Sequence, residues 1–298
     1  MDAQSREAEG VPADSGPQTV STAPLGCYGL GLTGGVVDLA AGLLGSSLPH
    51  WPAVEVEWTS PLLDPPAKGF FGPTETVLPL LTGGHVALDR ARRVARFHKP
   101  KPPNGHEVAH PCLSSVGLVF ARWDGRVPLH AGAVVVGGRA WGVLGDREAG
   151  KSTTLAHLAG AGYDVLADDL VVIDDGKACA GPRTLDLRLG TARRLQGRER
   201  LVEVRQGQRQ RMLLRPAPPA VPMGGLFVLG VGDEVSVRLV PPVERLTTLQ
   251  PHLMLRSAGL PASGLLNLVA LPMWRLNRST AWADLPRLID RLVTTAAA

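Results

Sequence analysis

The chain has 298 residues, of which 44% are hydrophobic and 19% charged, so it carries enough apolar content for one large or two ordinary globular domains. Its net charge of +4 is mild, and it permits an anionic partner without requiring nucleic acid. The three cysteines, Cys27, Cys112 and Cys179, form no CxxC or Cys/His spacing. This argues against a zinc site and a disulfide framework, and it fits a reducing cytoplasm.

The N-terminal stretch, residues 1–24, is rich in Ser, Pro, Gly and acidic groups and lacks the apolar centre of a signal peptide. This composition predicts a disordered tail. The next apolar stretch, Gly35–Leu48, is interrupted by Asp38 and is shorter than the roughly 18 residues of a membrane span. We therefore expect a buried helix there, no membrane partner and a cytoplasmic location.

Residues 25–110 are predicted to form a smaller α+β module of unassigned role. Short apolar stretches that alternate with polar residues predict three strands. These are Val54–Trp58, Glu75–Leu81 and His85–Asp89. The Pro-rich, basic stretch Phe97–Asn104 predicts a linker or exposed loop, and the boundary with the second module is expected near it.

The second module, residues 111–298, is predicted to open with a run of strands and one helix. The expected strands are Val116–Arg122, Leu129–Val136, Arg139–Leu144, Tyr163–Asp168 and Leu170–Ile173. Turns are predicted at Asp124-Gly125, Gly137-Gly138 and Asp174-Asp175-Gly176. A helix is predicted over Lys151–Ala161 because its composition is helical and Gly160 and Gly162 follow the pattern.

The C-terminal part of the chain is less regular. The Arg-rich residues 181–215 give no clear element, whereas Leu226–Leu229 and Val235–Val240 predict a hairpin. Three helices are expected after it. These are Pro242–Gln250, Ser263–Leu271 and Trp282–Val293, the last with an apolar face.

The most specific motif is the run Gly145–Ser152, which satisfies the Walker A pattern GxxxxGK followed by Ser or Thr. Glycines let the backbone curl so that successive N–H groups face a phosphate, and the following helix start adds partial positive charge. The predicted ATP-binding residues are Gly145, Asp146, Arg147, Glu148, Ala149, Gly150, Lys151, Ser152 and Thr153. Lys151 is expected to reach the β- and γ-phosphates, and the Ser152 hydroxyl is expected to face Mg²⁺.

Two carboxylates inside this loop, Asp146 and Glu148, are unfavourable beside phosphates. We expect their side chains to point away, or Arg147 to offset their charge.

The paired acids Asp168 and Asp169 end the predicted strand that follows the loop helix. Phosphoryl transfer with a metal ion needs a carboxylate near the cation and often another that deprotonates the nucleophile. Neighbouring strand residues point to opposite faces, so the two acids are predicted to have different roles unless a bulge intervenes. The alternative is a pair of solvated turn acids.

Three segments in order, Leu129-His130-Ala131-Gly132 on a strand, the loop Gly145–Ser152, and Ala167-Asp168-Asp169, resemble the catalytic domain of the HPr kinase/phosphorylase family. The likeness spans roughly 45 residues and is greatest to divergent HPr-kinase-like serine kinases of bacteria. It implies an α/β fold with a P-loop-containing, PEP-carboxykinase-like core and a mixed β-sheet. The loop lacks the usual Ser-Gly centre of the family, and the later family signature is not recognisable, so neither HPr nor phosphorylase activity is expected.

The resemblance also implies roles for single residues. Catalysis falls to Asp168, Asp169, His130 and Lys151, with His130 near the γ-phosphate. One aspartate is the base and the other supports the metal; Ser152 and Asp169 are the candidate metal ligands, and the division between the aspartates stays open. Without the resemblance, a lone His on a strand is more often a packed residue.

The Arg-rich stretch allows several interpretations. Arg183 or Arg188 could stabilise a transferring phosphate, and Arg193–Arg215 could recognise an acidic peptide. The stretch lacks interleaved aromatic residues, which argues against single-stranded nucleic acid. The alternative is a solvated Arg-rich face.

The predicted function is ATP- and Mg²⁺-dependent transfer of the γ-phosphoryl group to a hydroxyl, with a Ser of a protein or peptide as acceptor. A kinase for a small metabolite and a nucleotide-binding regulatory protein with little or no transfer are the alternatives. The sequence leaves the acceptor open and allows a homo-oligomer.

Overall fold

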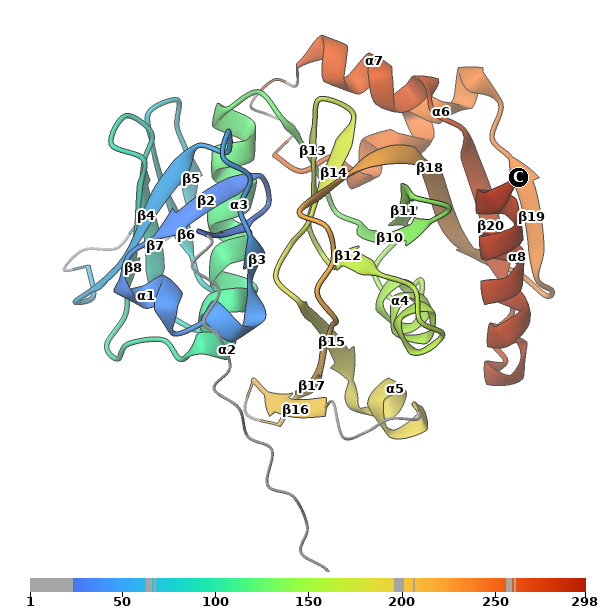
Figure 1. Ribbon diagram of the computed structural model, residues 1–298, viewed down its shortest axis with the longest axis horizontal. Helices are drawn as coiled ribbons and strands as arrows, with labels where there is room; N and C mark the ends of the chain where they lie inside the picture. Colours follow the sequence, from blue (N-terminus) through green and yellow to red (C-terminus); the bar gives the residue numbers. More distant parts are fainter. Residues whose placement is uncertain are drawn as a thin grey trace, which may run out of the picture.

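The computed structural model describes residues 24–298 apart from 63–65, 67, 196–200, 206, 256–258 and 260. The described residues form a mixed α/β structure with three β-sheets and flanking helices (Figure 1). The tail predicted over residues 1–24 lies outside the described residues except for Pro24. Among the described residues, no helix combines the length and the apolar character that a membrane crossing requires.

The first sheet has eight strands in the order β3-β1-β2-β4-β8-β7-β6-β5. They are β1 Leu25–Cys27, β2 Leu30–Thr33, β3 Gly45–Ser46, β4 Ala53–Thr59, β5 Phe70–Phe71, β6 Glu75–Pro79, β7 His85–Asp89 and β8 Val94–His98. The three predicted strands of this region are therefore confirmed. The buried helix predicted over Gly35–Leu48 is wrong, because this stretch holds only the four-residue helix α1 (Gly35–Asp38), a 3₁₀ turn at Ala41–Leu43 and strand β3.

Helix α3, Leu113–Trp123, lies between the first sheet and the rest of the chain (Figure 1). The strand predicted over Val116–Arg122 is wrong. A short apolar run does not distinguish a strand from a buried helix, and here Val116, Val119 and Phe120 recur on one helical face and are fully buried. The hairpin turn predicted at Asp124-Gly125 instead ends this helix.

One hydrophobic core joins the first sheet, α3 and part of the second sheet. Val54 and Phe97 of the first sheet share it with Phe120 of α3 and with Val172 and Cys179 from later strands. Part of the predicted exposed loop Phe97–Asn104 is therefore buried, since Phe97 belongs to β8 and Lys99 is covered. The division into residues 25–110 and 111–298 remains a prediction.

The second sheet has nine strands and carries the Gly145–Ser152 segment. Its strands follow the order β12-β10-β11-β18-β14-β13-β9, with β20 beside β18 and β19 beside β20. Their bounds are β9 Val127–Leu129, β10 Gly132–Val136, β11 Arg139–Leu144, β12 Val165–Ala167, β13 Val171–Asp174, β14 Lys177–Cys179, β18 Ala220–Val231, β19 Ser236–Leu239 and β20 Met273–Arg278. The turn at Gly137-Gly138 between β10 and β11 is confirmed.

Two strand predictions in this sheet are wrong. Leu129–Val136 is two strands, because the chain leaves β9 at Leu129, bends at His130 and enters β10 at Gly132, and the two strands have different partners. The hairpin of Leu226–Leu229 and Val235–Val240 does not form, because β20 lies between β18 and β19 and pairs with both.

The Arg-rich residues that gave no element form the third sheet, in the order β15-β17-β16. Its strands are β15 Thr184–Arg188, β16 Leu201–Val204 and β17 Arg209–Leu213. The helix α5, Leu189–Arg194, follows β15.

The predicted helices of the second half are confirmed. They are α4 Lys151–Gly160, α6 Pro242–Leu249, α7 Ala262–Ala270 and α8 Leu285–Ala297, the last preceded by a 3₁₀ turn at Trp282–Asp284. Helices α4 and α8 pack together beside the second sheet (Figure 1). Leu288 and Leu292 of α8 are fully buried there. A further short helical segment, α2 Gly105–Glu107 followed by a π-type turn at Val108–Cys112, leads into α3.

Candidate active site

Strand direction gathers the predicted site residues at one edge of the second sheet. β12 and β11 are each antiparallel to β10, so β11 and β12 run the same way, and β18 and β20 run parallel to β11. The carboxyl ends of these four strands therefore lie at the same edge, where β10 begins. The Gly145–Gly150 loop, Asp168 and Arg278 lie at the carboxyl ends of β11, β12 and β20, and His130 lies just before the start of β10 at the same edge.

The Gly145–Gly150 loop connects β11 to helix α4, and its glycines adopt backbone conformations that other residues rarely reach. Gly145 has φ +151° and Gly150, the residue before the helix, has φ +101°. A Cβ at Gly150 would lie 2.9 Å from Nε of Arg278, whose guanidinium donates to the Ala149 carbonyl at 2.7 Å. Arg278 thus holds the loop from the end of β20, and Gly150 leaves room for it.

Lys151 is buried and folds back over this loop. Its Nζ donates to the carbonyls of Gly145 at 2.7 Å and Asp146 at 3.2 Å. Burial lowers the pKa of Lys151, while the carboxylates of Asp168 and Asp169 oppose that effect. The amine is therefore held at the mouth of the loop, bonded to neutral carbonyls that a phosphate could replace.

Arg188 at the end of β15, more than Arg147, offsets the acidic loop residue Glu148. Glu148 has a left-handed backbone, φ +73°, and its exposed carboxylate accepts a hydrogen bond from Arg188 Nη2 at 2.5 Å. This bond is the first cause of the lowered pKa of Glu148, and Arg147 contributes less. The offset expected from Arg147 therefore comes mainly from Arg188, a residue 40 positions away in the sequence.

Asp168 is buried beside the start of α4. Its Oδ2 accepts a hydrogen bond from the Ser152 hydroxyl at 3.0 Å, and its Oδ1 is buried without a hydrogen-bond partner. Burial, followed by the nearby charge of Asp169, raises the pKa of Asp168 from 3.8 to about 8. A buried acid with an unpaired oxygen next to a hydroxyl is an arrangement that a cation would stabilise.

Asp169 has a different environment from its neighbour. Its φ of +64° is left-handed, which an Asp tolerates better than most residues, and this breaks the alternation of a strand. The side chain is 44% exposed, borders the same cavity and lies 3.6 Å from Nε2 of His110. The prediction that the two acids differ therefore agrees with their surroundings.

His130 reaches the site from the bend between β9 and β10 rather than from within a strand. Its backbone N–H donates to the His252 carbonyl at 2.7 Å, and its Nδ1 lies 3.1 Å from the carbonyl oxygen of Asp169. The ring borders the same cavity as Lys151 and Asp169.

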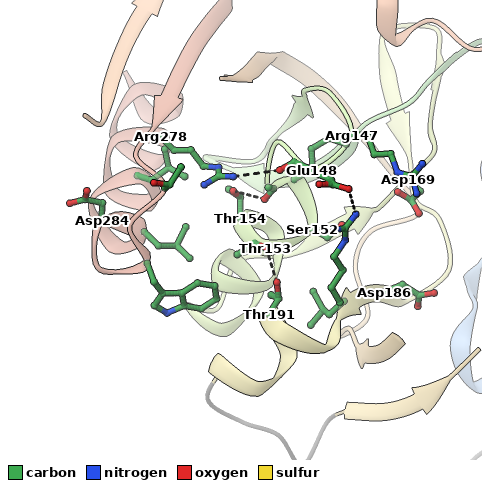
Figure 2. Close-up of a pocket in the computed structure, with 18 of the residues that line it drawn as sticks. Arg147, Glu148, Ser152, Thr153, Thr154, Asp169, Asp186, Thr191, Arg278 and Asp284 are labelled. Carbon is green, nitrogen blue, oxygen red and sulfur yellow. Dashed lines mark hydrogen bonds and ion pairs between the residues drawn. The ribbon is translucent and has the colours of Figure 1, made fainter. Parts of the chain in front are cut away.

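The cavity at this edge has a volume of about 560 Å³. Figure 2 shows its walls, which come from the loop, α4, the β15–α5 segment and the start of the C-terminal helix. Its lining combines charged side chains, among them Lys151 and Asp169, with apolar ones, among them Trp282 and Leu285. A cavity of mixed lining can accept a ligand that has both an anionic and an apolar part.

Several lining residues were not predicted from the sequence. Arg205, Arg209 and Arg278 add positive charge, and Trp282 and Thr191 also line the cavity. For Arg205 and Arg209 the only signal was the Arg-rich composition of residues 181–215, which does not say which arginines face the cavity. Arg278 and Trp282 lie outside that stretch.

Arg183, one of the two arginines considered for phosphate, lies elsewhere and donates to the Gly42 carbonyl. Arg188, the other, does border the cavity.

A buried charged cluster lies behind Asp169. Arg211 donates to both oxygens of Asp186, at 2.6 and 3.0 Å, and Arg205 Nη2 lies 3.2 Å from the same carboxylate. Burial raises the pKa of Asp186, but the bonds and charge of Arg211 outweigh it and lower the pKa overall. His110 borders this cluster, and burial lowers its pKa.

A divalent cation fits the residues present. Among the described residues, no three His, Cys, Asp or Glu side chains form a ready metal cluster. Mg²⁺ does not need one, because it is commonly held by one or two carboxylates together with substrate phosphates and water. Ser152 and Asp168, with the unpaired Oδ1 of Asp168, meet that requirement.

Comparison with known proteins leaves the family open. No protein-family model and no curated protein matches the chain. Among solved structures, the Hpr(Ser) kinase/phosphatase from Coxiella burnetii is similar in part, with 11% sequence identity, a TM-score of 0.31 and coverage of 56% of this chain and 88% of that chain. A likeness of this extent does not decide a family, so membership stays a proposal.

We predict that Asp168→Asn raises the melting temperature of the ligand-free protein more at pH 9 than at pH 6. The folded pKa of about 8 lies above the ordinary 3.8, so the neutral acid contributes stability at low pH that is lost as pH rises towards 8. Asn cannot ionise and avoids this loss. Calorimetry should show a gain that grows by at least about 2–4 °C, the shift for about 1 kcal/mol in a domain of this class.

The matched control is Asp175→Asn at an exposed turn. It should show no pH-dependent difference. An Asp168→Asn gain that is equal at both pH values would contradict the burial of a neutral acid.

Proposed function

We propose that this chain is a phosphotransferase that moves the γ-phosphoryl group of ATP to a hydroxyl, with a Ser of a protein or peptide as the acceptor. The observation that carries the proposal is that one cavity is lined by Lys151, Ser152 and Asp169, and that Ser152 is hydrogen-bonded to the buried Asp168 next to it. Phosphoryl transfer depends mainly on positioning and charge stabilisation, and these are the groups it uses.

We assign the donor nucleotide to this cavity because its lining offers groups for both the triphosphate and the base. The triphosphate lies along the Gly145–Gly150 loop, where the α4 N-terminus and Lys151 offer hydrogen-bond donors. The base is placed towards Trp282, an aromatic residue that borders the cavity. The sequence order of His130, the loop and the two aspartates supports placing the chain among the HPr-kinase-like serine kinases.

The two aspartates take separate roles in this proposal. Ser152 is bonded to Asp168 and not to Asp169, so we assign Mg²⁺ to Ser152 and Asp168 and the base to Asp169. A bound Mg²⁺ would supply the positive charge that keeps the buried Asp168 ionised and screens the phosphate oxygens. This reverses the expectation that Asp169 is the acid paired with Ser152.

The reaction step assigned to these residues is balanced. The acceptor oxygen forms a bond to the γ-phosphorus, the bond from that phosphorus to the β–γ bridging oxygen breaks, and the hydroxyl proton passes to Asp169. ADP leaves with the bridging oxygen, and Lys151 and Arg278 neutralise the negative charge that develops there.

A second hollow supports a peptide as the acceptor. It has a volume of about 980 Å³ and borders His110 and Arg205, close to Asp169. From there it extends to Lys101 and Gln208, between the first part of the chain and the third sheet. A small metabolite would not need this space, whereas an extended peptide could lie in it with its hydroxyl towards Asp169.

One observation favours a second candidate function, a nucleotide-binding protein without transfer. The exposed pair of Glu148 and Arg188 borders the donor cavity and places a carboxylate beside the loop. A carboxylate there opposes the phosphates of a bound nucleotide and keeps Arg188 from them.

We predict that Lys151→Ala weakens Mg·ATP binding by about 10–100-fold, because a charge-assisted phosphate contact contributes about 1.5–3 kcal/mol. Isothermal titration calorimetry measures this directly. Lys177→Ala is the control, since Lys177 is an exposed lysine on β14 and lies outside the cavity. Equal Mg·ATP affinities in the two variants would contradict the assignment of the Gly145–Gly150 loop to the nucleotide-binding site.

We predict that Asp169→Asn lowers transfer to a mixture of Ser-containing peptides by about 10²–10⁴-fold, the usual contribution of a general base. Mass spectrometry of the peptides after incubation with Mg·ATP measures the transfer. Nucleotide affinity should change little, because Asp169 is not assigned to the donor. Transfer at the wild-type rate would refute the base, and nucleotide binding by the wild-type protein without any transfer would favour the second candidate.

A further inference from the structure

His110 is a buried histidine from the first part of the chain whose ring reaches the site. Within the Val108–Cys112 turn it alone has an extended backbone, φ −155° and ψ 127°, and its side chain is 11% exposed. Its Nε2 lies 3.6 Å from Oδ2 of Asp169 and 3.9 Å from Oδ2 of Asp186. That nitrogen is buried without a hydrogen-bond partner.

The proton arrangement of this ring follows from its neighbours. Ionised carboxylates only accept hydrogen bonds, so a ring nitrogen that faces two of them must carry the hydrogen. The other nitrogen, Nδ1, lies 2.9 Å from the Ser114 hydroxyl, which in turn lies 3.2 Å from the Tyr28 hydroxyl. Ser114 can donate to Nδ1 and accept from Tyr28, which leaves the hydrogen of the neutral ring on Nε2.

Of the two carboxylates, Asp169 is the one with oxygen atoms free to accept a hydrogen bond from Nε2 of His110. Asp186 already accepts two bonds from Arg211 and lies 3.2 Å from Arg205. The ion-pair partner of the Asp169 carboxylate among the described residues is His110, within 4 Å. The distance of 3.6 Å is slightly longer than a hydrogen bond, but Asp169 is nearly half exposed and a small rotation closes the gap.

We propose that His110 is a positioning residue that donates a hydrogen bond from Nε2 to Asp169 and orients its carboxylate towards the cavity. One oxygen of Asp169 is held by His110, so the other faces the acceptor hydroxyl. Ser114 and Tyr28 fix the ring behind it, and the first part of the chain thereby completes the site. The inference deepens the proposed phosphotransfer and rests on it for the role of Asp169.

Two variants separate the hydrogen bond from simple packing. His110→Leu keeps a similar volume and removes the donor. His110→Gln keeps an N–H donor near the position of Nε2. In assays with Mg·ATP and the peptide mixture, His110→Leu should lower kcat by about 10–100-fold, the usual effect of removing an orienting partner. The KM for ATP should stay within about twofold, and His110→Gln should recover most of kcat. A His110→Leu variant with wild-type kcat, or equal losses in both variants at equal melting temperature, would overturn the proposal.

A spectroscopic test needs no turnover. ¹⁵N NMR of the imidazole nitrogens, with the His110 signals assigned by their loss in His110→Gln, should show the hydrogen on Nε2. Asp169→Asn should shift these signals, whereas Asp175→Asn at the exposed turn should not. A hydrogen on Nδ1, or signals indifferent to Asp169→Asn, would overturn the pairing. If the signals respond but wild-type protein transfers no phosphate, the pairing stands and the proposed function fails.

Discussion

The hydrogen bond from Ser152 to Asp168, 3.0 Å long and partly buried, connects the start of α4 to the end of β12. It forms because β11 and β12 run in the same direction, so the loop after one and the acid after the other meet at one sheet edge. Asp168 would be an unfavourable buried acid without a compensating group. Its hydroxyl partner satisfies one oxygen and leaves the other for a cation. The positions of Lys151, His130 and Asp169 all follow from this edge.

The charges that border the cavity favour a ligand that carries phosphates together with a divalent cation. Lys151 and the arginines at 188, 205, 209 and 278 border it, and part of their charge is met inside the protein by Glu148 and Asp186. The amine of Lys151 is bonded to carbonyls, and burial raises the pKa of Asp168 to about 8. A ligand that brings phosphates together with a divalent cation would satisfy both groups at once. The same reasoning explains why Glu148, beside the loop, is paired with Arg188.

The features that the sequence predicted correctly are those that depend on residues close together in the chain. The loop, helix α4, the paired acids and the C-terminal helix follow from glycine positions, helical periodicity and strand ends within a few residues. Helix α3 was misread as a strand because Val116–Ala121 is a short apolar run, which fits a strand as well as a buried helix, and only its packing between two sheets distinguishes the two forms. The partners of the site, His110, Arg205 and Arg278, come from distant segments whose pairing no short window contains. His130 was found through resemblance, although it lies in a bend and not in a strand.

The central claim is that a triphosphate and Mg²⁺ occupy the cavity between the Gly145–Gly150 loop and Asp168. A crystal structure with a non-hydrolysable ATP analogue and Mg²⁺ tests it most directly. The account predicts that Nζ of Lys151 leaves the carbonyls of Gly145 and Asp146 for the phosphates, with the cation beside Ser152 and Asp168. An analogue bound elsewhere, with Lys151 still bonded to Gly145, would contradict the account.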